Sequence, residues 1–483
     1  MAKILEMNIV GRYEQVIDLQ EVMSSPKSEL VAILGRRRVG KTFLIRNYFM
    51  NSITFDFTGM YEVGLDDHME RFSVAMGKCF FNGIATTKPA HWYEAFDQLE
   101  IAVSKLRSKK KKVLVFDELP WMGMSHISFK KAFNLFWNNF ANSRTDIVVL
   151  MTGSSSAWMH NQVFRDKGGL FQRVTKRIHL EPFTLHETEL YAKSRNLPLN
   201  KYALLDLYMI FGGIPFYLDL VRQDESVVQC VDRLFFRKNA ELKTEFHELF
   251  KSLFNDKPIY KDIVNLLAKH QDGLFRNELT SQLKLTSGGQ LSSILDELES
   301  TGFIMAIHTF GNKKKDKKYR LLDAYTLFYH RFVKDNADNQ NWTQLCKTQN
   351  WISWSGIAFE NACFQHVSQI KEALKISGII TKQAGWHHKG SADMHGAQID
   401  LLIDRDDKII NLCEMKYYNN KLTMTKEIAE SIRSKIASFT YFTQSKKTIM
   451  PIMISPFGLN INQHSNGLIN KSLETDALFL KVE

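Results

Sequence analysis

Eight residues near the N-terminus match the phosphate-binding pattern G-x-x-x-x-G-K-[ST] in full: Gly35-Arg36-Arg37-Arg38-Val39-Gly40-Lys41-Thr42. The two glycines let the backbone curl so that its N–H groups face phosphate oxygens, and the dipole of a following helix adds to the attraction. In this pattern Lys41 reaches the β- and γ-phosphates and Thr42 ligates Mg²⁺. The segment therefore predicts a binding site for ATP and Mg²⁺.

Two adjacent acids, Asp117 and Glu118, follow the apolar run Val113–Phe116. We expect Asp117 to hold Mg²⁺ through water and Glu118 to orient or deprotonate the water that attacks the γ-phosphate. An apolar run that ends in two acids is common, so the assignment depends on the phosphate-binding loop upstream. Together the two segments predict ATP hydrolysis.

Polar residues after a third apolar run, Ile147–Met151, extend this prediction. Thr152 and Ser154 stand where a side chain could sense the γ-phosphate, although a turn made by Gly-Ser-Ser-Ser explains them nearly as well. Arg173 is a candidate arginine finger, acting in the same chain or in a second copy. A surface ion pair is the structural alternative for Arg173.

A second group of candidate catalytic residues lies near the C-terminus. Asp400 lies in one apolar run, and Glu414 and Lys416 lie in the next, across a turn at Asp406-Asp407. Asp400 should face Cys413 or Glu414, and a single bulge would place Asp400, Glu414 and Lys416 on one face. Two close carboxylates repel each other unless a cation such as Mg²⁺ lies between them. Lys416 could then orient a water or stabilise a pentavalent phosphate. The structural alternative is a hairpin with a cross-strand ion pair.

The pattern of apolar runs predicts the elements that position these residues. Val31–Leu34, Val113–Phe116 and Ile147–Met151 read as buried strands separated by helical stretches, which is typical of a parallel sheet covered by helices. We expect this core in residues 1–183, followed by a helical lid in 184–254.

The remaining chain is predicted to form two further domains. Helices at 260–269, 276–283 and 291–300, followed by strands at 303–309 and 318–322, predict a winged helix in 255–335. A polar segment at 334–350 is predicted to contain a linker, and residues 345–483 read as an α/β domain. The lysines of Lys313–Lys318 lie between the two winged-helix strands, where they suggest sequence-independent contact with nucleic acid phosphates. A solvated loop explains them about as well.

Composition excludes several classes of protein. The chain has 483 residues, of which 44% are hydrophobic and 24% charged, so it is not a disordered chain. Its five cysteines form no C-x-x-C pair, which argues against a zinc ribbon or a disulfide framework. No apolar run approaches the roughly 18 residues that a membrane span needs, so we expect a soluble, cytoplasmic protein with no membrane partner. The formal charge of +11 permits polyanionic partners without establishing them.

The motifs of the first 335 residues resemble those of a known family. Gly11-Arg12, the loop Gly35–Thr42, Phe116-Asp117-Glu118, Gly153-Ser154-Ser155 and Gly212-Gly213-Ile214-Pro215 occur in the order found in archaeal-type ATPases of the STAND class, which are P-loop NTPases related to AAA+ proteins. The resemblance implies a signalling or molecular-switch ATPase followed by a winged helix. It also implies that Arg173 corresponds to the family's arginine, and that Gly213-Ile214-Pro215 couples nucleotide state to the helical domain.

The C-terminal residues resemble the PD-(D/E)xK restriction-endonuclease-like superfamily. Asp400 takes the D position, Glu414 the E and Lys416 the K, while Glu360 matches an acid that often precedes them. Ile399 stands where the superfamily's name has proline. The resemblance implies a Mg²⁺-dependent nuclease, although a catalytically inactive relic of the fold stays open.

Three functions remain open from the sequence. The favoured one is a switch ATPase whose ATP state gates a Mg²⁺-dependent nuclease acting on nucleic acid, with DNA favoured but RNA not excluded. The resemblance of the architecture implies a role in defence or in a mobile element. The second is a DNA- or protein-binding regulatory ATPase with an inactive nuclease-like domain. The third is a scaffold that uses nucleotide only for stability. A protein trigger and homo-oligomerisation also remain open.

Overall fold

The computed structural model describes residues 9–125, 127–154, 156–159, 163, 170, 172–254, 257–285, 288–311, 317–336 and 340–482. The chain forms two compact units. The first comprises Met1–Pro182 and Lys251–Asp256, and the second comprises Phe183–Phe250 and Lys257–Glu483. Several predicted residues, among them Ser155 and Lys313–Asp316, lie outside the described parts of the chain.

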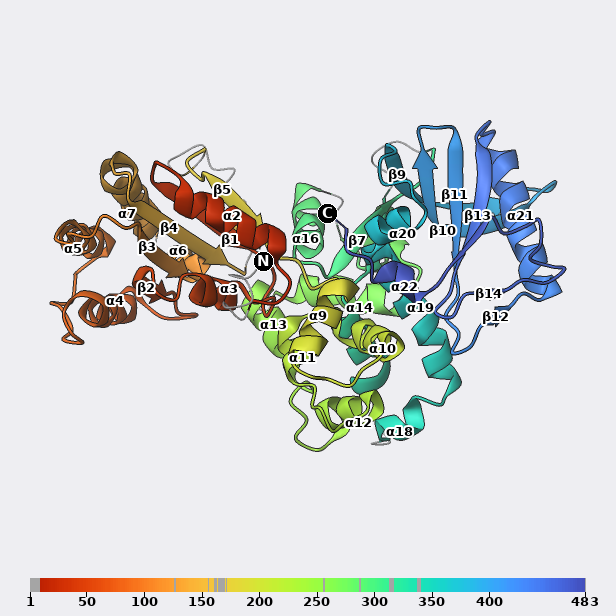
Figure 1. Cartoon of the computed structure of the whole chain (residues 1–483), viewed down its shortest axis with the longest axis horizontal. Helices are drawn as coiled ribbons and strands as arrows, with labels where there is room; N and C mark the ends of the chain where they lie inside the picture. The colour runs from red at the N-terminus through yellow and green to blue at the C-terminus, as the bar shows by residue number, and fades with distance from the viewer. Residues whose placement is uncertain are drawn as a thin grey trace. The chain divides into compact units, whose positions relative to one another are not determined.

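A five-stranded parallel sheet forms the centre of the first unit (Figure 1). Its strand order is β2 (Ile53–Thr58), β3 (Lys112–Asp117), β4 (Ile147–Gly153), β1 (Glu29–Leu34) and β5 (Lys176–His179). The three apolar runs predicted as strands are β1, β3 and β4, so the parallel sheet is confirmed. Because β4 lies between β1 and β3, the carboxyl ends of the strands that carry the loop, the polar residues and the acids meet along one edge of the sheet.

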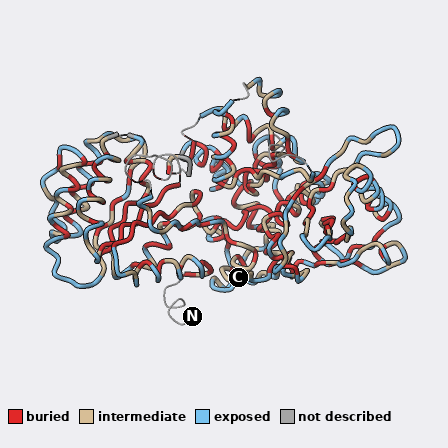
Figure 2. Tube along the Cα trace, turned by 90° about the horizontal axis from the view of Figure 1, so that it is seen from above, coloured by how far each residue is buried: buried red, intermediate tan, exposed pale blue. Residues whose placement is uncertain are grey.

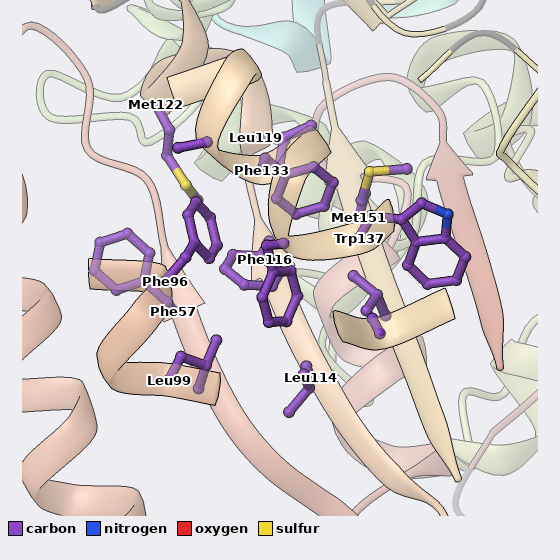
Figure 3. Close-up of a cluster of buried hydrophobic side chains, with 14 of the residues drawn as sticks. Phe57, Phe96, Leu99, Leu114, Phe116, Leu119, Met122, Phe133, Trp137 and Met151 are labelled. Atoms are coloured by element: carbon purple, nitrogen blue, oxygen red, sulfur yellow. The ribbon is translucent and has the colours of Figure 1, made fainter. Parts of the chain in front are cut away.

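Helices cover this sheet and complete its core. They are α2 (Tyr13–Ser24), α3 (Lys41–Tyr48), α4 (Leu65–Phe80), α5 (Trp92–Ser104), α6 (Leu119–Ser125), α7 (Ile127–Leu135) and α8 (Ser156–Met159). Figure 3 shows the aromatic cluster in which Phe116 of β3 meets Phe96 of α5 and Phe133 of α7. All three side chains are at most 2% exposed, so this packing fixes β3 rigidly. The strand that carries the two acids therefore has a firm support.

Short helices begin the second unit: α9 (Leu185–Ser194), α10 (Lys201–Phe211), α11 (Pro215–Asp219), α12 (Val227–Val231) and α13 (Glu245–Phe254), of which α13 continues into the first unit. Gly213 breaks the chain between α10 and α11 with φ of 68°. A Cβ at Gly213 would lie 2.1 Å from the Phe183 carbonyl oxygen, so only glycine fits this turn. The predicted helical character of 184–254 is confirmed.

In the second unit, the segment predicted to be a winged helix, and called so from here on, has helices and strands in the predicted order. It contains α14 (Pro258–Lys269), β6 (Leu274–Phe275), α15 (Arg276–Gln282), α16 (Gly289–Ser300), β7 (Ile304–His308) and β8 (Lys317–Leu321), and α17 (Ala324–Phe328) follows it. The three strands form a small sheet in the order β6-β8-β7.

A mixed five-stranded sheet forms the last part of the chain, in the order β15-β13-β11-β10-β9. These strands are β9 (Thr381–Gly390), β10 (His395–Arg405), β11 (Ile409–Met415), β13 (Thr448–Ile454) and β15 (Lys471–Leu473). The remaining elements are α18 (Trp342–Leu345), α19 (Gln349–Gln365), α20 (Val367–Ala373), β12 (Leu422–Thr423), α21 (Lys426–Thr443), β14 (Leu459–Asn460) and α22 (Thr475–Leu478). Buried residues follow the central strands of both large sheets (Figure 2).

The segment 334–350, predicted to contain a linker, is in part a packed helix. Trp342 in α18 is 2% exposed, and its ring contacts those of Phe236, Phe332 and Trp351. The segment is rich in asparagine and glutamine, which suggests an exposed linker. The free energy gained by burying the Trp342 ring nevertheless favours a packed helix. Trp342 therefore anchors α18 to the second unit's core, while most of the other residues of 340–350 are exposed.

Candidate functional site

The phosphate-binding loop lies between β1 and α3, as predicted. Gly35 has φ of 146°, and a Cβ there would lie 2.4 Å from the Leu180 carbonyl oxygen, so the position requires glycine. Gly40 and Arg38 also have positive φ, at 94° and 72°, which gives the tight curl of the loop. Arg36 and Val39 are buried, whereas Arg37 and Arg38 are half-buried.

Lys41 is folded into the loop. Its Nζ donates hydrogen bonds to the carbonyl oxygens of Gly35, at 2.9 Å, and Arg36, at 3.2 Å. Burial lowers the pKa of Lys41, and the nearby carboxylates of Glu118 and Asp117 partly offset that effect. The amine is thus a buried cation beside the loop's backbone amides, which suits it to a polyanionic ligand.

Thr42, Asp117 and Thr152 form one hydrogen-bonded group. The Thr42 hydroxyl donates to Asp117 Oδ2 at 2.9 Å, and the Thr152 hydroxyl donates to Asp117 Oδ1. Hydroxyl and carboxylate oxygens are ligands that Mg²⁺ prefers, so the donor set fits the metal that accompanies ATP. Thr42 would bind the ion directly, and Asp117 would hold it through water.

Glu118 and Ser154 are held together beside this group. Ser154 Oγ donates to Glu118 Oε2 at 2.8 Å, and the Ser154 backbone N–H donates to the same atom at 3.2 Å. The Glu118 N–H in turn donates to Thr152 Oγ1 at 2.9 Å. Thr152 therefore connects both acids, which is a role that the sequence pattern did not reveal.

Arg12 also supports the phosphate-binding loop, which the sequence pattern did not predict. Its guanidinium donates to the carbonyl oxygens of Glu181, at 2.7 Å, and Val39, at 3.0 Å. Arg12 is 6% exposed and stands in a left-handed conformation before α2. Arg12 thereby links Val39 of the phosphate-binding loop to Glu181, which follows β5.

The structure does not bring Arg173 to the loop. Arg173 is exposed and lies just before β5, whose register pairs Lys176 with Val31. It therefore lies level with the amino end of β1, whereas the loop follows the carboxyl end, on the order of 15–20 Å away along a strand. A role on a nucleotide would thus have to be exerted on a second copy of the chain, which stays a prediction.

The C-terminal residues gather around an irregularity in β10. The pairing of β10 with β9 shifts by one residue between Ile399 and Leu402, which is the region that contains Asp400. In β11, Leu401 is opposite Cys413, so Asp400 and Glu414 stand at the same end of the hairpin. The bulge lies in the pairing with β9, whereas the sequence suggested one in the hairpin with β11, where the register from Asp404 to Leu401 is regular. Gln398 Nε2 donates to Asp400 Oδ1 at 2.7 Å.

Three cations from the protein hold the acids of this site. Arg320 of β8 donates to Glu360 Oε2 of α19 at 2.8 Å. Glu414 Oε1 lies 3.1 Å from Lys416 Nζ, and Glu414 Oε2 lies 2.7 Å from Lys435 Nζ of α21. The sequence singled out neither Arg320 nor Lys435.

The pKa values of Glu360 and Lys416 are shifted by burial and by the charges around them. Burial raises the pKa of Glu360, the Arg320 guanidinium lowers it, and the Asp400 carboxylate raises it further. Burial acts to lower the pKa of Lys416, but Glu414 and then Glu360 raise it above its ordinary value. Within the described residues, no group of three His, Cys, Asp or Glu side chains is arranged to hold a metal ion. Glu360 and Glu414 are thus neutralised by arginine and lysine, whereas Asp400 accepts a hydrogen bond from the neutral amide of Gln398.

The helical segment also contacts this site. The Tyr417 hydroxyl, directly after Lys416, donates to Asp206 of α10 and lies 2.7 Å from the Tyr202 hydroxyl. Burial raises the pKa of Asp206 to about 6. Strand β11 is therefore attached to the helix that ends at Gly212, immediately before the glycine turn.

Other predictions concern the chain as a whole. The five cysteines, all in described segments, are free thiols. Among the helices of the described residues, none has the length and apolar character needed to cross a membrane.

The segment that contains the phosphate-binding loop matches a known family. Residues 9–221 match a family described as an ATPase domain predominantly from Archaea. A protein of Methanocaldococcus jannaschii, named only as uncharacterized, is 24% identical over 438 residues, which are 88% of this chain and 91% of that protein.

Two solved structures are also similar. A Walker-type ATPase of Pyrococcus abyssi matches with a TM-score of 0.51 and 17% identity over 67% of this chain and 97% of its own. A STAND protein with a tetratricopeptide repeat sensor from Pyrococcus horikoshii matches with a TM-score of 0.30 and 14% identity over 77% of this chain and 52% of its own. Residues 9–221 thus match a family of archaeal-type ATPase domains, and the likeness to the Walker-type ATPase supports the predicted P-loop ATPase fold.

Proposed function

We propose that this protein is a switch ATPase whose nucleotide state controls a Mg²⁺-dependent nuclease site built from Asp400, Glu414 and Lys416, with Glu360 as a supporting acid. The observation that carries this proposal is the register of β10 with β11, in which Leu401 is opposite Cys413, so that Asp400 and Glu414 come next at the same end of the hairpin. Two carboxylates and a lysine can bind a metal and stabilise charge on a phosphodiester during hydrolysis.

The ATPase domain would supply the switch. Lys41, Thr42 and Asp117 would hold ATP and Mg²⁺, Glu118 would position the attacking water, and Ser154, bonded to Glu118, would respond to the γ-phosphate. Bound Mg²⁺ would neutralise charge on the phosphates. In the second unit, the contact between Tyr417 and Asp206 offers a route from the helical segment to β11.

One observation favours a second function. Glu360 is paired with Arg320, and Glu414 is paired with two lysines, which is also what an inactive nuclease-like domain retained for binding would show. In that case the protein would be a regulatory ATPase that binds nucleic acid or protein without cleaving it.

Cleavage assays on single-stranded DNA, duplex DNA and RNA separate the two functions. Wild type would be tested with Mg²⁺ or Mn²⁺, and with ATP, ADP or no nucleotide. Asp400→Ala and Lys416→Ala should abolish cleavage and leave ATP turnover intact, whereas Asp393→Ala, an exposed acid in the turn before β10, should change neither. Cleavage that persists in Asp400→Ala, or wild type that neither cleaves nor binds metal at Asp400, would remove the nuclease proposal.

A further inference from the structure

The winged helix covers the free edge of the C-terminal sheet. Strand β9 is the last strand of that sheet, and Thr309, just after β7, pairs with Gly385 in β9. The Phe310 N–H donates to the Gly385 carbonyl oxygen at 2.8 Å. The approach is close, because a Cβ on Gly385 would lie 3.1 Å from Ile307 Cγ2. Backbone pairing of this kind fixes one element against another.

An aromatic side chain anchors the same contact. The Phe310 ring lies 5.0 Å from that of Phe439 in α21, between ring centroids. Phe310 packs against the hydrophobic cluster that also contains Trp386 and Leu402. The winged helix therefore contributes a side chain to the core of the sheet that carries Asp400.

Arg320 extends from this winged helix to the acids. Its side chain is 2% exposed, and its Nη2 lies 2.8 Å from Glu360 Oε2 and 3.3 Å from the Ile357 carbonyl oxygen. The guanidinium also lies over the Phe364 ring, at 5.4 Å from its centroid. Burying an arginine is costly unless a carboxylate compensates its charge, and Glu360 is that carboxylate. A protein cation thus lies beside the acids where a metal ion would be needed.

The remaining space beside Asp400 is small. A cleft between the winged helix and the sheet is lined by Lys318, Arg320, Trp386 and Asp400, among others, and has a free volume of about 30 Å³. That volume admits a few water molecules, whereas sites for small organic ligands span roughly 300–1,000 Å³. With the winged helix in place, the enclosed part of this cleft is therefore too small to hold a nucleotide beside Asp400.

The geometry points to Arg320 as a built-in inhibitor: the winged helix keeps the C-terminal site closed by placing the Arg320 guanidinium on Glu360, and the site opens to Mg²⁺ and to a nucleic acid strand when that contact is released. This inference rests on the proposed nuclease function. Arg320 and a divalent cation compete for the same negative charge, so metal binding and release of the winged helix favour each other.

Metal binding and cleavage test this inference together. The measurements use the full chain in a Lys41→Ala background without nucleotide, so that the phosphate-binding loop contributes no nucleotide-bound ion. Mn²⁺ binding is followed by electron paramagnetic resonance. Arg320→Met should raise the Mn²⁺ affinity at least tenfold, should lose that gain when combined with Asp400→Ala, and should give cleavage without ATP.

Two further variants keep the test decisive. Phe310→Asp should release the winged helix while keeping Arg320, and it should produce the same gain if Arg320→Met folds poorly. Arg233→Met is the matched control, because Arg233 forms a comparably buried pair with Glu225 in the helical segment. This control should leave Mn²⁺ binding and cleavage unchanged.

The outcomes separate the inference from the function on which it rests. If wild type already binds Mn²⁺ and cleaves as well as Arg320→Met and Phe310→Asp, the inhibitory role is wrong and the nuclease function stands. If cleavage falls in both variants, Arg320 supports the site instead of blocking it, and the inference is again wrong. If all three proteins neither bind Mn²⁺ through Asp400 nor cleave, the nuclease function itself is wrong.

Discussion

The two candidate sites of this chain treat their acids in opposite ways. At the phosphate-binding loop, Asp117 accepts hydrogen bonds from two threonine hydroxyls and Glu118 from Ser154. At the C-terminal sheet, Glu360 is paired with Arg320, and Glu414 with Lys416 and Lys435. Hydroxyls orient a carboxylate and leave its charge in place, whereas arginine and lysine neutralise it. The first site therefore suits a metal–nucleotide ligand, while the second, under the proposed function, must exchange a protein cation for a metal.

The largest expected effect is that of Lys41→Ala. Removing the buried amine takes away a contact to the phosphates and a donor that stabilises transition-state charge. The first loss should cost roughly 2–5 kcal/mol in binding, and the second about 10²–10³ in kcat. Together kcat/KM for ATP should fall by about 10⁴ or more, measured by phosphate release. Lys78→Ala, an exposed lysine in α4, is the control. Near-normal turnover in Lys41→Ala would show that this site is not the one that hydrolyses ATP.

Glu118→Gln should separate binding from hydrolysis at the same site. Glutamine keeps an oxygen that can accept from Ser154, but it cannot take a proton from water. Turnover should fall by about 10²–10⁴ while ATP affinity stays within a few-fold of wild type. Single-turnover hydrolysis and equilibrium nucleotide binding measure the two quantities. If turnover is little changed, Glu118 only positions Ser154. The orientation of Glu118 by a hydroxyl would then have no catalytic role at the first site.

The sequence predicts a site well when the residues of that site lie close together in the chain or follow neighbouring strands. The phosphate-binding loop is eight consecutive residues, and Asp117 and Ser154 follow apolar strands whose parallel ends must meet, so local patterns sufficed. The register of the β10–β11 hairpin was also predicted to within one residue, because it follows from the turn, whereas the bulge against β9 was not predicted. Arg320 lies 40 positions from Glu360, and Asp206 lies 211 positions from Tyr417. Contacts of that kind depend on how separate elements pack, which leaves no periodic signal in the sequence.

Asp206 offers a pH-dependent test on the C-terminal side of the comparison. Its pKa in the folded chain is about 6, against an ordinary value of 3.8, because the carboxyl group is buried. Between these values the folded chain holds more protons than the unfolded chain, so stability falls as the pH rises from about 4 to about 6. Asp206→Asn removes this penalty, whose upper bound is about 3 kcal/mol.

The expected result is a difference in Tm that depends on pH. Asp206→Asn should gain on wild type as the pH rises through this window and should keep a constant advantage above it, as measured by scanning calorimetry of the second unit's transition. Asp219→Asn, an acid at the end of α11 that pairs with Arg195, is the control. A difference in Tm that stays flat from pH 4 to 7 would show that Asp206 is not buried as a charged group.

The smallest expected effect, that of Lys435→Met, tests the difference between the sites most directly. Lys435 Nζ lies 2.7 Å from Glu414 Oε2, its side chain is 20% exposed, and methionine keeps its apolar length. An ion pair at this exposure contributes up to about 1 kcal/mol, so its removal should raise Mn²⁺ affinity about fivefold in the Lys41→Ala background. Lys421→Met, an exposed lysine after β11, should have no effect. Weaker Mn²⁺ binding in Lys435→Met would mean that Lys435 orients Glu414 for the metal, as the threonines orient Asp117. The two sites would then differ only in the pairing of Arg320 with Glu360. The lysine charges beside Glu414 would in that case hold this acid in position for the metal and would not compete with the metal.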